Sequence, residues 1–105
     1  MENEAKTLKI EQTRENDVLT CRLFGWLDPN TSPMLVNGID ISDVLHVVFD
    51  LSAVEYVFSA GLRAFIQIKR TMDEKNGSIT LKNVSPSIRS IFEYTGLESM
   101  LEPQP

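Results

Sequence analysis

The stretch Asp50-Leu51-Ser52-Ala53-Val54-Glu55-Tyr56-Val57-Phe58-Ser59-Ala60-Gly61-Leu62 is predicted to lead the chain from a strand into a helix. The apolar run His46–Leu51 contains few polar residues, which is typical of a short strand covered on both faces. Residues 52–58 are predicted to be the loop that leaves this strand. From Leu62 to Met72, apolar residues recur at helical spacing, which predicts an amphipathic helix from Ser59 to about Lys75.

Ser59 lies at the junction of these two elements, and two interpretations of it stay open. In the first, Ser59 is the N-cap of the helix, and its oxygen accepts a hydrogen bond from a free backbone N–H of the first turn. In the second, Ser59 is a phosphate acceptor, because the same N–H groups and the helix dipole suit a phosphate. Position alone favours the cap, since most serines that precede helices are caps.

The remaining segments predict an α/β fold. Two strands, Thr7–Glu11 and Val18–Phe24, flank a turn-forming segment and are expected to pair as an antiparallel hairpin. Ser78–Lys82 is a further strand, and Ser85-Pro86 begins a helix that ends at Gly96. Alternating strands and helices after a hairpin predict a mixed β-sheet of four to five strands with helices packed against it. We expect residues 1–105 to form a single domain.

A helix is also predicted near Pro33, but its length stays open. Pro33 suits the first helical turn, with Thr31 or Ser32 as the cap. Residues as far as Leu45 share a helical face. Against a long helix stands Asn37-Gly38, because this pair breaks helices and glycine costs about 1 kcal/mol relative to alanine in a helix interior. A short helix that ends at Asn37 is the alternative.

The composition excludes several classes of protein. A formal net charge of −5 over 105 residues argues against nucleic-acid binding through an overall basic field. No apolar run approaches the roughly 20 residues that a membrane-spanning helix needs. Residues 1–6 are polar and lack the apolar core of a signal peptide, so we expect a cytoplasmic protein with no membrane partner.

Cys21 and His46 carry the two side chains that most often do chemistry in proteins. Cys21 is the single cysteine, which excludes an intramolecular disulfide and a multi-cysteine metal site. It alternates in phase with Leu19 and Leu23, so it is predicted to be a buried hydrophobe. His46 is the single histidine and has no serine or cysteine partner near it in sequence, so it is expected to be structural. We predict no catalytic residue, no metal and no cofactor.

Three blocks of the sequence, in order, resemble the STAS domain, the fold of bacterial anti-sigma factor antagonists. The stretch 50–62 is similar to the family's signature Asp-Leu-Ser-x-Val-x-Phe-(apolar)-Asp-Ser-(Ser/Ala)-Gly-Leu. Gly25-Trp26-Leu27-Asp28 is similar to the family's Gly-Arg-Leu-Asp block. The segment from Asn83 to Leu97 is similar to its Asn-x-Ser-Pro…Thr-Gly-Leu helix. The resemblance covers nearly the whole chain.

The resemblance implies a partner-switching protein and not an enzyme. In the family, the unphosphorylated antagonist binds an anti-sigma factor that is also a serine kinase, which releases a sigma factor. Phosphorylation of the antagonist ends that interaction. Carried over to this chain, Ser59 is the phosphoacceptor, Asp28 contacts the partner or its nucleotide, and Gly61 permits close approach at the helix start. The expected partner-binding residues are Trp26, Asp28, Phe58, Ser59, Ala60, Gly61 and Arg63.

Two residues depart from the family's pattern. Phe58 stands where the family has the Asp before its serine, and Trp26 stands where it has Arg. Each has two readings, a core residue or an exposed aromatic anchor of an interface. Both are expected at the same end of the sheet, near Arg63, which lies within one turn of Ser59 and can meet a phosphate or an acidic group. The alternative function, which Phe58 supports, is an interaction scaffold of the same fold in a transport or signalling assembly that is never phosphorylated. We expect a monomer or a weak dimer.

Overall fold

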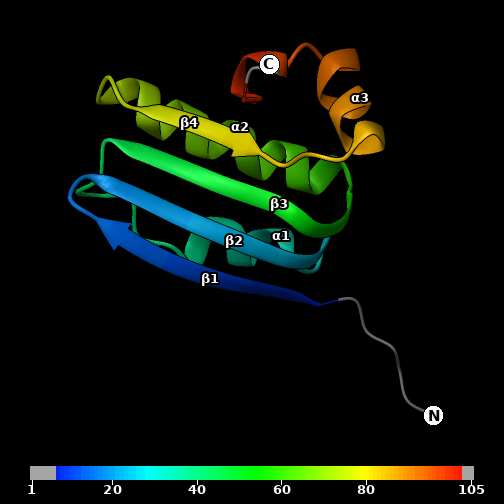
Figure 1. The fold of residues 1–105 in the computed structure, drawn as a ribbon, viewed down its shortest axis with the longest axis horizontal. Helices are drawn as coiled ribbons and strands as arrows, with labels where there is room; N and C mark the ends of the chain where they lie inside the picture. The colour runs from blue at the N-terminus through cyan, green and yellow to red at the C-terminus, as the bar shows by residue number, and fades with distance from the viewer. Residues whose placement is uncertain (1–6, 103–105) are drawn as a thin grey trace.

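The computed structural model describes residues 7–102, which form a four-stranded mixed sheet with helices against it (Figure 1). Residues 1–6, on which the signal-peptide argument depends, lie outside the described residues. The elements in chain order are β1 (Leu8–Glu15), β2 (Val18–Leu27), α1 (Ser32–Asn37), β3 (His46–Val57), α2 (Ser59–Glu74), β4 (Ser78–Lys82), α3 (Pro86–Tyr94) and the short 3-10 helix η1 (Glu98–Met100).

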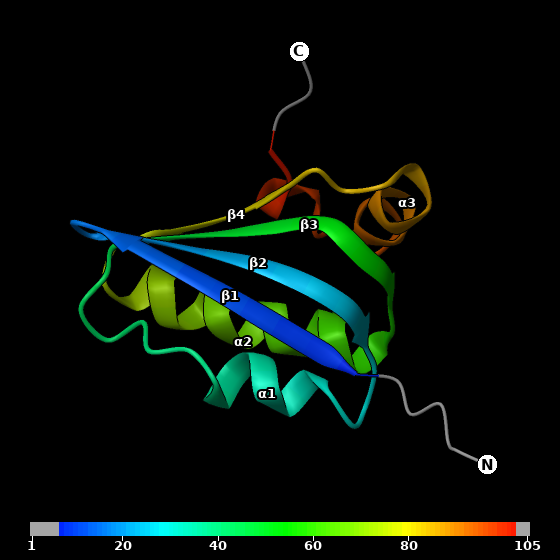
Figure 2. The same cartoon turned by 60° about the horizontal axis from the view of Figure 1, so that its bottom comes forward.

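The strands lie in the order β1-β2-β3-β4, with β1 antiparallel to β2 and the other neighbours parallel. Helices α1 and α2 cover one face of this sheet, whereas α3 and η1 lie beside β4, at the edge far from β1 (Figures 1 and 2). The arrangement confirms the predicted α/β class with its opening hairpin, and the sheet of the described residues has four strands.

The core lies between the sheet and the helices. Phe49 of β3 packs edge-on against Phe65 of α2, with ring centroids 5.3 Å apart, and Phe65 also contacts Phe92 of α3 at 5.9 Å. Cys21 is fully buried, which confirms its predicted strand phase. Burial raises the pKa of the Cys21 thiol to about 12, so at neutral pH it stays a protonated core side chain.

Strand β3 is longer than predicted, and this is the main correction to the fold. It continues to Val57, so the predicted loop 52–58 is wrong except at its last residue. Two steps along β2, from Arg22 to Phe24, correspond to three along β3, from Asp50 to Ala53, and a second register shift precedes Tyr56. These bulges interrupt the alternation of inward and outward side chains after Asp50. Residues 52–57 therefore lack the regular pattern by which a strand is recognised in sequence.

Helix α1 is the short alternative, because it ends at Asn37 and Gly38 follows as its C-cap. Thr31 occupies the N-cap position, but its side chain makes no capping hydrogen bond. The helix after β4 begins and ends as predicted. The Ser85 hydroxyl accepts a bond from the Ile88 N–H at 3.4 Å, and Gly96 at the far end has a φ of +78°.

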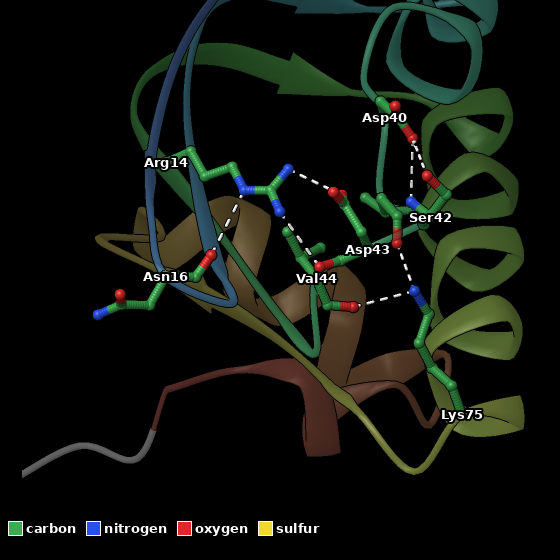
Figure 3. Close-up of polar contacts among 8 residues, drawn as sticks. Arg14, Asn16, Asp40, Ser42, Asp43, Val44 and Lys75 are labelled. Carbon is green, nitrogen blue, oxygen red and sulfur yellow. Dashed lines mark hydrogen bonds and ion pairs between the residues drawn. The ribbon is translucent and has the colours of Figure 1, made fainter.

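Charged side chains hold the connection between α1 and β3 (Figure 3). Arg14 of β1 donates to the Asp43 carboxylate at 2.7 Å and to the Asp43 backbone oxygen at 3.2 Å. Lys75, just after α2, donates to the backbone oxygens of Ile41 and Val44. These bonds lie at the end of the sheet away from the start of α2, so they fix α1 beside α2 without occupying that start.

Candidate functional site

Ser59 is the first residue of α2 and is not its cap. The N-cap is Phe58, whose backbone is extended (φ −92°, ψ 177°) and whose side chain makes no capping bond. The Phe58 carbonyl oxygen accepts hydrogen bonds from the N–H groups of Gly61 at 2.9 Å and Leu62 at 3.1 Å. The Ser59 side chain is exposed and makes no hydrogen bond within residues 7–102. The cap interpretation is therefore wrong, because the helix begins one residue earlier than a serine cap at position 59 requires, and the Ser59 side chain is exposed.

Gly61 brings the start of α2 close to the ends of two strands. A Cβ atom at this position would lie 2.8 Å from Cβ of Leu27 and 2.9 Å from Cγ1 of Val57, and both of those residues are buried. The Leu27 carbonyl oxygen also accepts a bond from the Phe58 N–H at 2.8 Å. The absence of a side chain at Gly61 lets the start of α2 lie against the ends of β2 and β3, which confirms the close approach predicted at the helix start. This packing fixes the position of Ser59 and Ala60 relative to the end of the sheet.

Three aromatic side chains gather beside Ser59, and we call Trp26, Tyr56 and Phe58 the aromatic surface. The Phe58 ring lies edge-on to Tyr56 at 4.9 Å and 6.1 Å from the Trp26 ring. Phe58 is 41% exposed and Tyr56 is 38% exposed, so the core reading of Phe58 is wrong. Trp26 is half-buried. Sequence reasoning placed Trp26 and Phe58 together but missed Tyr56, whose spacing of two from Phe58 was hidden by the assumed loop.

Asp28 faces into the loop between β2 and α1. It is 8% exposed, and its Oδ1 accepts hydrogen bonds from the N–H groups of Asn30 and Thr31, both at 2.9 Å. The Thr31 N–H bond, first among several, holds the pKa of the Asp28 carboxyl below its usual value. Asp28 thus shapes the loop that follows Trp26 and the end of β2, and the partner contact that the resemblance implies for Asp28 stays a prediction.

Arg63 is the cation nearest to Ser59 along α2. It lies four residues after Ser59, one turn along the helix, and its side chain is exposed. Lys69 and Arg89 are paired with Asp73 and Glu93, whereas Arg63 forms no ion pair within residues 7–102. Its guanidinium is therefore available to an anion.

The family model of the STAS domain matches residues 8–105. The chain belongs to the STAS domain family. The anti-sigma F factor antagonist of Paenibacillus polymyxa is 28% identical over 94 residues, which cover 86% of this chain and 80% of that protein. The anti-sigma-B factor antagonist of Listeria monocytogenes is 25% identical over 92 residues, which cover 85% of this chain and 81% of that protein.

Solved structures with the same fold include the anti-sigma factor antagonist SpoIIAA in its unphosphorylated form. It superposes on this STAS domain with a TM-score of 0.81 at 20% identity, over 92% of this chain and 89% of that one. The Bacillus cell fate determinant SpoIIAA in the phosphorylated form superposes with a TM-score of 0.68 at 19% identity, over 92% of each chain. Both likenesses concern the fold.

Other kinds of site receive no support from the part of this STAS domain that the structure describes. Residues 7–102 hold no group of three or more His, Cys, Asp or Glu side chains placed to bind a metal ion. The helices within the same range are too short or too polar to span a membrane. His46 lies at the start of β3, where its Nδ1 is 2.8 Å from the Ser78 hydroxyl, at the far end of β3 from Ser59.

Proposed function

We propose that this STAS domain is an anti-sigma factor antagonist that works by partner switching. It binds an anti-sigma factor that is also a serine kinase, and phosphorylation of Ser59 ends the binding. The proposal places the protein in the cytoplasm and gives it no catalytic activity, cofactor or nucleic-acid partner. The observation that carries it is the exposed Ser59 hydroxyl, which makes no hydrogen bond within residues 7–102, directly follows Phe58 of the aromatic surface and precedes Arg63 by one helical turn.

Electrostatics at the start of α2 supports the switch. The first turn of the helix contains no acidic side chain, so its positive end is not compensated there. A phosphate on Ser59 adds about −1.5 to −2 charges at neutral pH, next to the helix end and one turn from Arg63. The same charge weakens binding of a partner packed on the aromatic surface, because the phosphate would lose its hydration in an apolar contact. In this proposal Trp26, Phe58 and Ala60 form the contact, the buried Gly61 holds the helix start against the sheet behind them, and Asp28 holds the loop between β2 and α1.

The test begins with capture of partners. Immobilised wild-type protein and a Ser59→Glu variant are exposed to extract of the native cells, and bound proteins are identified by mass spectrometry. We expect the wild type, and not the variant, to retain a protein with a kinase domain. That kinase with Mg-ATP is then expected to add the mass of one phosphate to the wild type but not to Ser59→Ala.

A matched control separates Ser59 from other serines. Ser87 is also exposed in the first turn of a helix, so Ser87→Ala should still gain the phosphate. Phosphate on Ser87 with Ser59 unmodified would contradict the proposal. The scaffold alternative, which the aromatic Phe58 favours, predicts capture of a partner that never adds phosphate.

A further inference from the structure

A cavity of about 440 Å³ lies between α1 and α2. Helix α1 contributes Ser32, Val36 and Asn37 to its walls, and α2 contributes Arg63, Ala64 and Gln67. This volume falls within the range of about 300–1,000 Å³ that is usual for small-ligand sites. The cavity is a different feature from the aromatic surface, since none of Trp26, Tyr56 and Phe58 lines it.

Ser32 supplies the first sign that the cavity takes a ligand. The residue is 3% exposed, and its Oγ has no hydrogen-bond partner within residues 7–102. A buried hydroxyl without a partner is uncommon, because it loses its bonds to water and gains nothing in return. Ser32 lines the cavity, but its Oγ is closed off in the present rotamer, so the side chain must rotate about χ1 before an acceptor atom in the cavity can supply the missing bond.

Arg63 supplies the second sign. It is the only charged residue among those that line the cavity, and it forms no ion pair within residues 7–102. Among the residues that the structure describes, no carboxylate lines the cavity to compensate it. The amides of Asn37 and Gln67 add neutral donors on both walls. One guanidinium with a hydroxyl and amide donors balances one negative charge and matches the planar geometry of a carboxylate.

The rest of the lining determines the shape of the ligand. Ala60, Ala64 and Val36 leave an apolar floor with room for a few carbon atoms. We propose that the cavity between α1 and α2 binds a carboxylate that carries a short carbon chain, with Arg63 as its ion partner and the Ser32 hydroxyl as a donor. The carboxylate belongs either to a free small molecule or to an acidic residue of a bound polypeptide. The proposal concerns the chain with Ser59 unphosphorylated, because a phosphate on Ser59 would compete with the ligand for Arg63.

Titration with butyrate, followed by two-dimensional ¹H–¹⁵N NMR, tests the proposal on the full chain. We expect saturable shifts of the Arg63 and Gln67 side-chain signals, and none with butyramide, which has the same shape and no charge. Arg63→Gln should weaken binding at least about tenfold, since it removes the cation. Ser32→Ala should weaken it about three- to tenfold through loss of one donor. Arg89→Gln, in an arginine paired with Glu93 on α3, should leave binding unchanged.

Three results would overturn the proposal. They are shifts that do not saturate, equal shifts with butyramide, and undiminished binding by an Arg63→Gln variant whose melting curve shows that it is folded. Inorganic phosphate serves as a rival anion, and tighter binding of phosphate than of butyrate would also overturn the assignment to a carboxylate. A blocked glutamate, with blocked glutamine as its control, distinguishes the two sources. Binding of both butyrate and the blocked glutamate indicates a polypeptide side chain, and binding of butyrate alone indicates a free carboxylate.

Discussion

The rings of Trp26 and Phe58 lie 6.1 Å apart between centroids, one near the end of β2 and the other just before α2. The STAS pattern has an arginine and an aspartate at these two positions. In this chain two neighbouring rings thus stand where the pattern has two residues of opposite charge. With the proposed function, the partner surface that meets these rings beside Ser59 is expected to be apolar.

Phe58→Ala tests this inference through binding. Because the ring is 41% exposed, its removal should lower the free energy of unfolding by only about 1 kcal/mol, well below the cost of a buried phenylalanine. Loss of an interface anchor should lower partner affinity by about 2 kcal/mol or more. Urea unfolding and binding isotherms measure the two effects. Tyr94→Ala is the matched control, because Tyr94 is 94% exposed on α3 and should change neither. A large loss of stability with unchanged affinity would count against the anchor.

Phe58→Asp restores the residue of the family pattern at the N-cap of α2. An aspartate there can accept a hydrogen bond from a free N–H of the first turn and also interacts well with the helix dipole. We expect about 1 kcal/mol of added stability from the cap. We also expect faster phosphorylation of Ser59, and weaker binding through loss of the ring. Thermal melts and phosphorylation time courses give the readouts, and a slower time course would contradict the expected role of this position.

Ser59→Ala and Ser59→Glu separate the switch from folding. Because the Ser59 hydroxyl makes no hydrogen bond within residues 7–102, its removal should change stability by less than about 0.5 kcal/mol and leave partner binding intact. Ser59→Glu should stabilise α2 by about 0.3–1 kcal/mol through the dipole while it weakens binding. A stabilised variant that still binds as well as the wild type would argue against a charge switch.

Gly61→Ala tests the contact that holds α2 on the sheet. The added methyl group would lie within 3 Å of Leu27 and Val57 side-chain atoms, in a part of the structure that is buried. We expect a loss of about 1–3 kcal/mol of stability, as for overpacked cores. Ala60→Gly is a useful comparison, because it also changes the helix start but adds no atom. If denaturant unfolding gives Gly61→Ala the same stability as the wild type, the start of α2 can move away from Leu27 and Val57 without cost, which contradicts this prediction.

The Asp28 carboxyl is expected to make the stability of the fold depend on pH in the acid range. Its folded-state pKa is lowered, chiefly by the Thr31 N–H, so its contribution to stability is complete above the unfolded value of about 3.9. That contribution should disappear as the pH falls through the lower folded value. Asp28→Asn should therefore lose stability at neutral pH and show a flatter acid limb. Melting temperatures between neutral pH and pH 3 measure the effect, with Asp73→Asn as a surface control.

Much of this fold follows from local patterns. Helix α2, strand β4 and the capped start of α3 were predicted because their periodicity and end residues agree with each other. The burial of Cys21 followed from its phase with Leu19 and Leu23. The register of β3 was not predictable, because its bulges depend on pairing with β2 and leave no local signal.

The site was predicted in part. Sequence placed Ser59, Phe58 and Trp26 at one end of the sheet, and the ring contact confirms that neighbourhood for the last two. Position alone favoured a cap role for Ser59 over a phosphate acceptor, and a one-residue difference in the helix start removes that cap role. The unpartnered hydroxyl of Ser32 had no sequence signal, since burial and a missing partner arise only when α1 packs beside α2.

Strand β3 has two residues more than the stretch of β2 with which it pairs. The arrangement of the aromatic surface therefore depends on the number of residues in β3. Each bulge resets which side chains of the strand point outward, so the orientation of Tyr56 depends on how many residues follow Asp50 as well as on which ones they are. Deleting one residue from this segment would leave its composition almost unchanged and yet turn the ring away from its present neighbours. Relatives that differ here by one insertion or deletion would then recognise different partners, a route to divergence that substitutions alone do not offer.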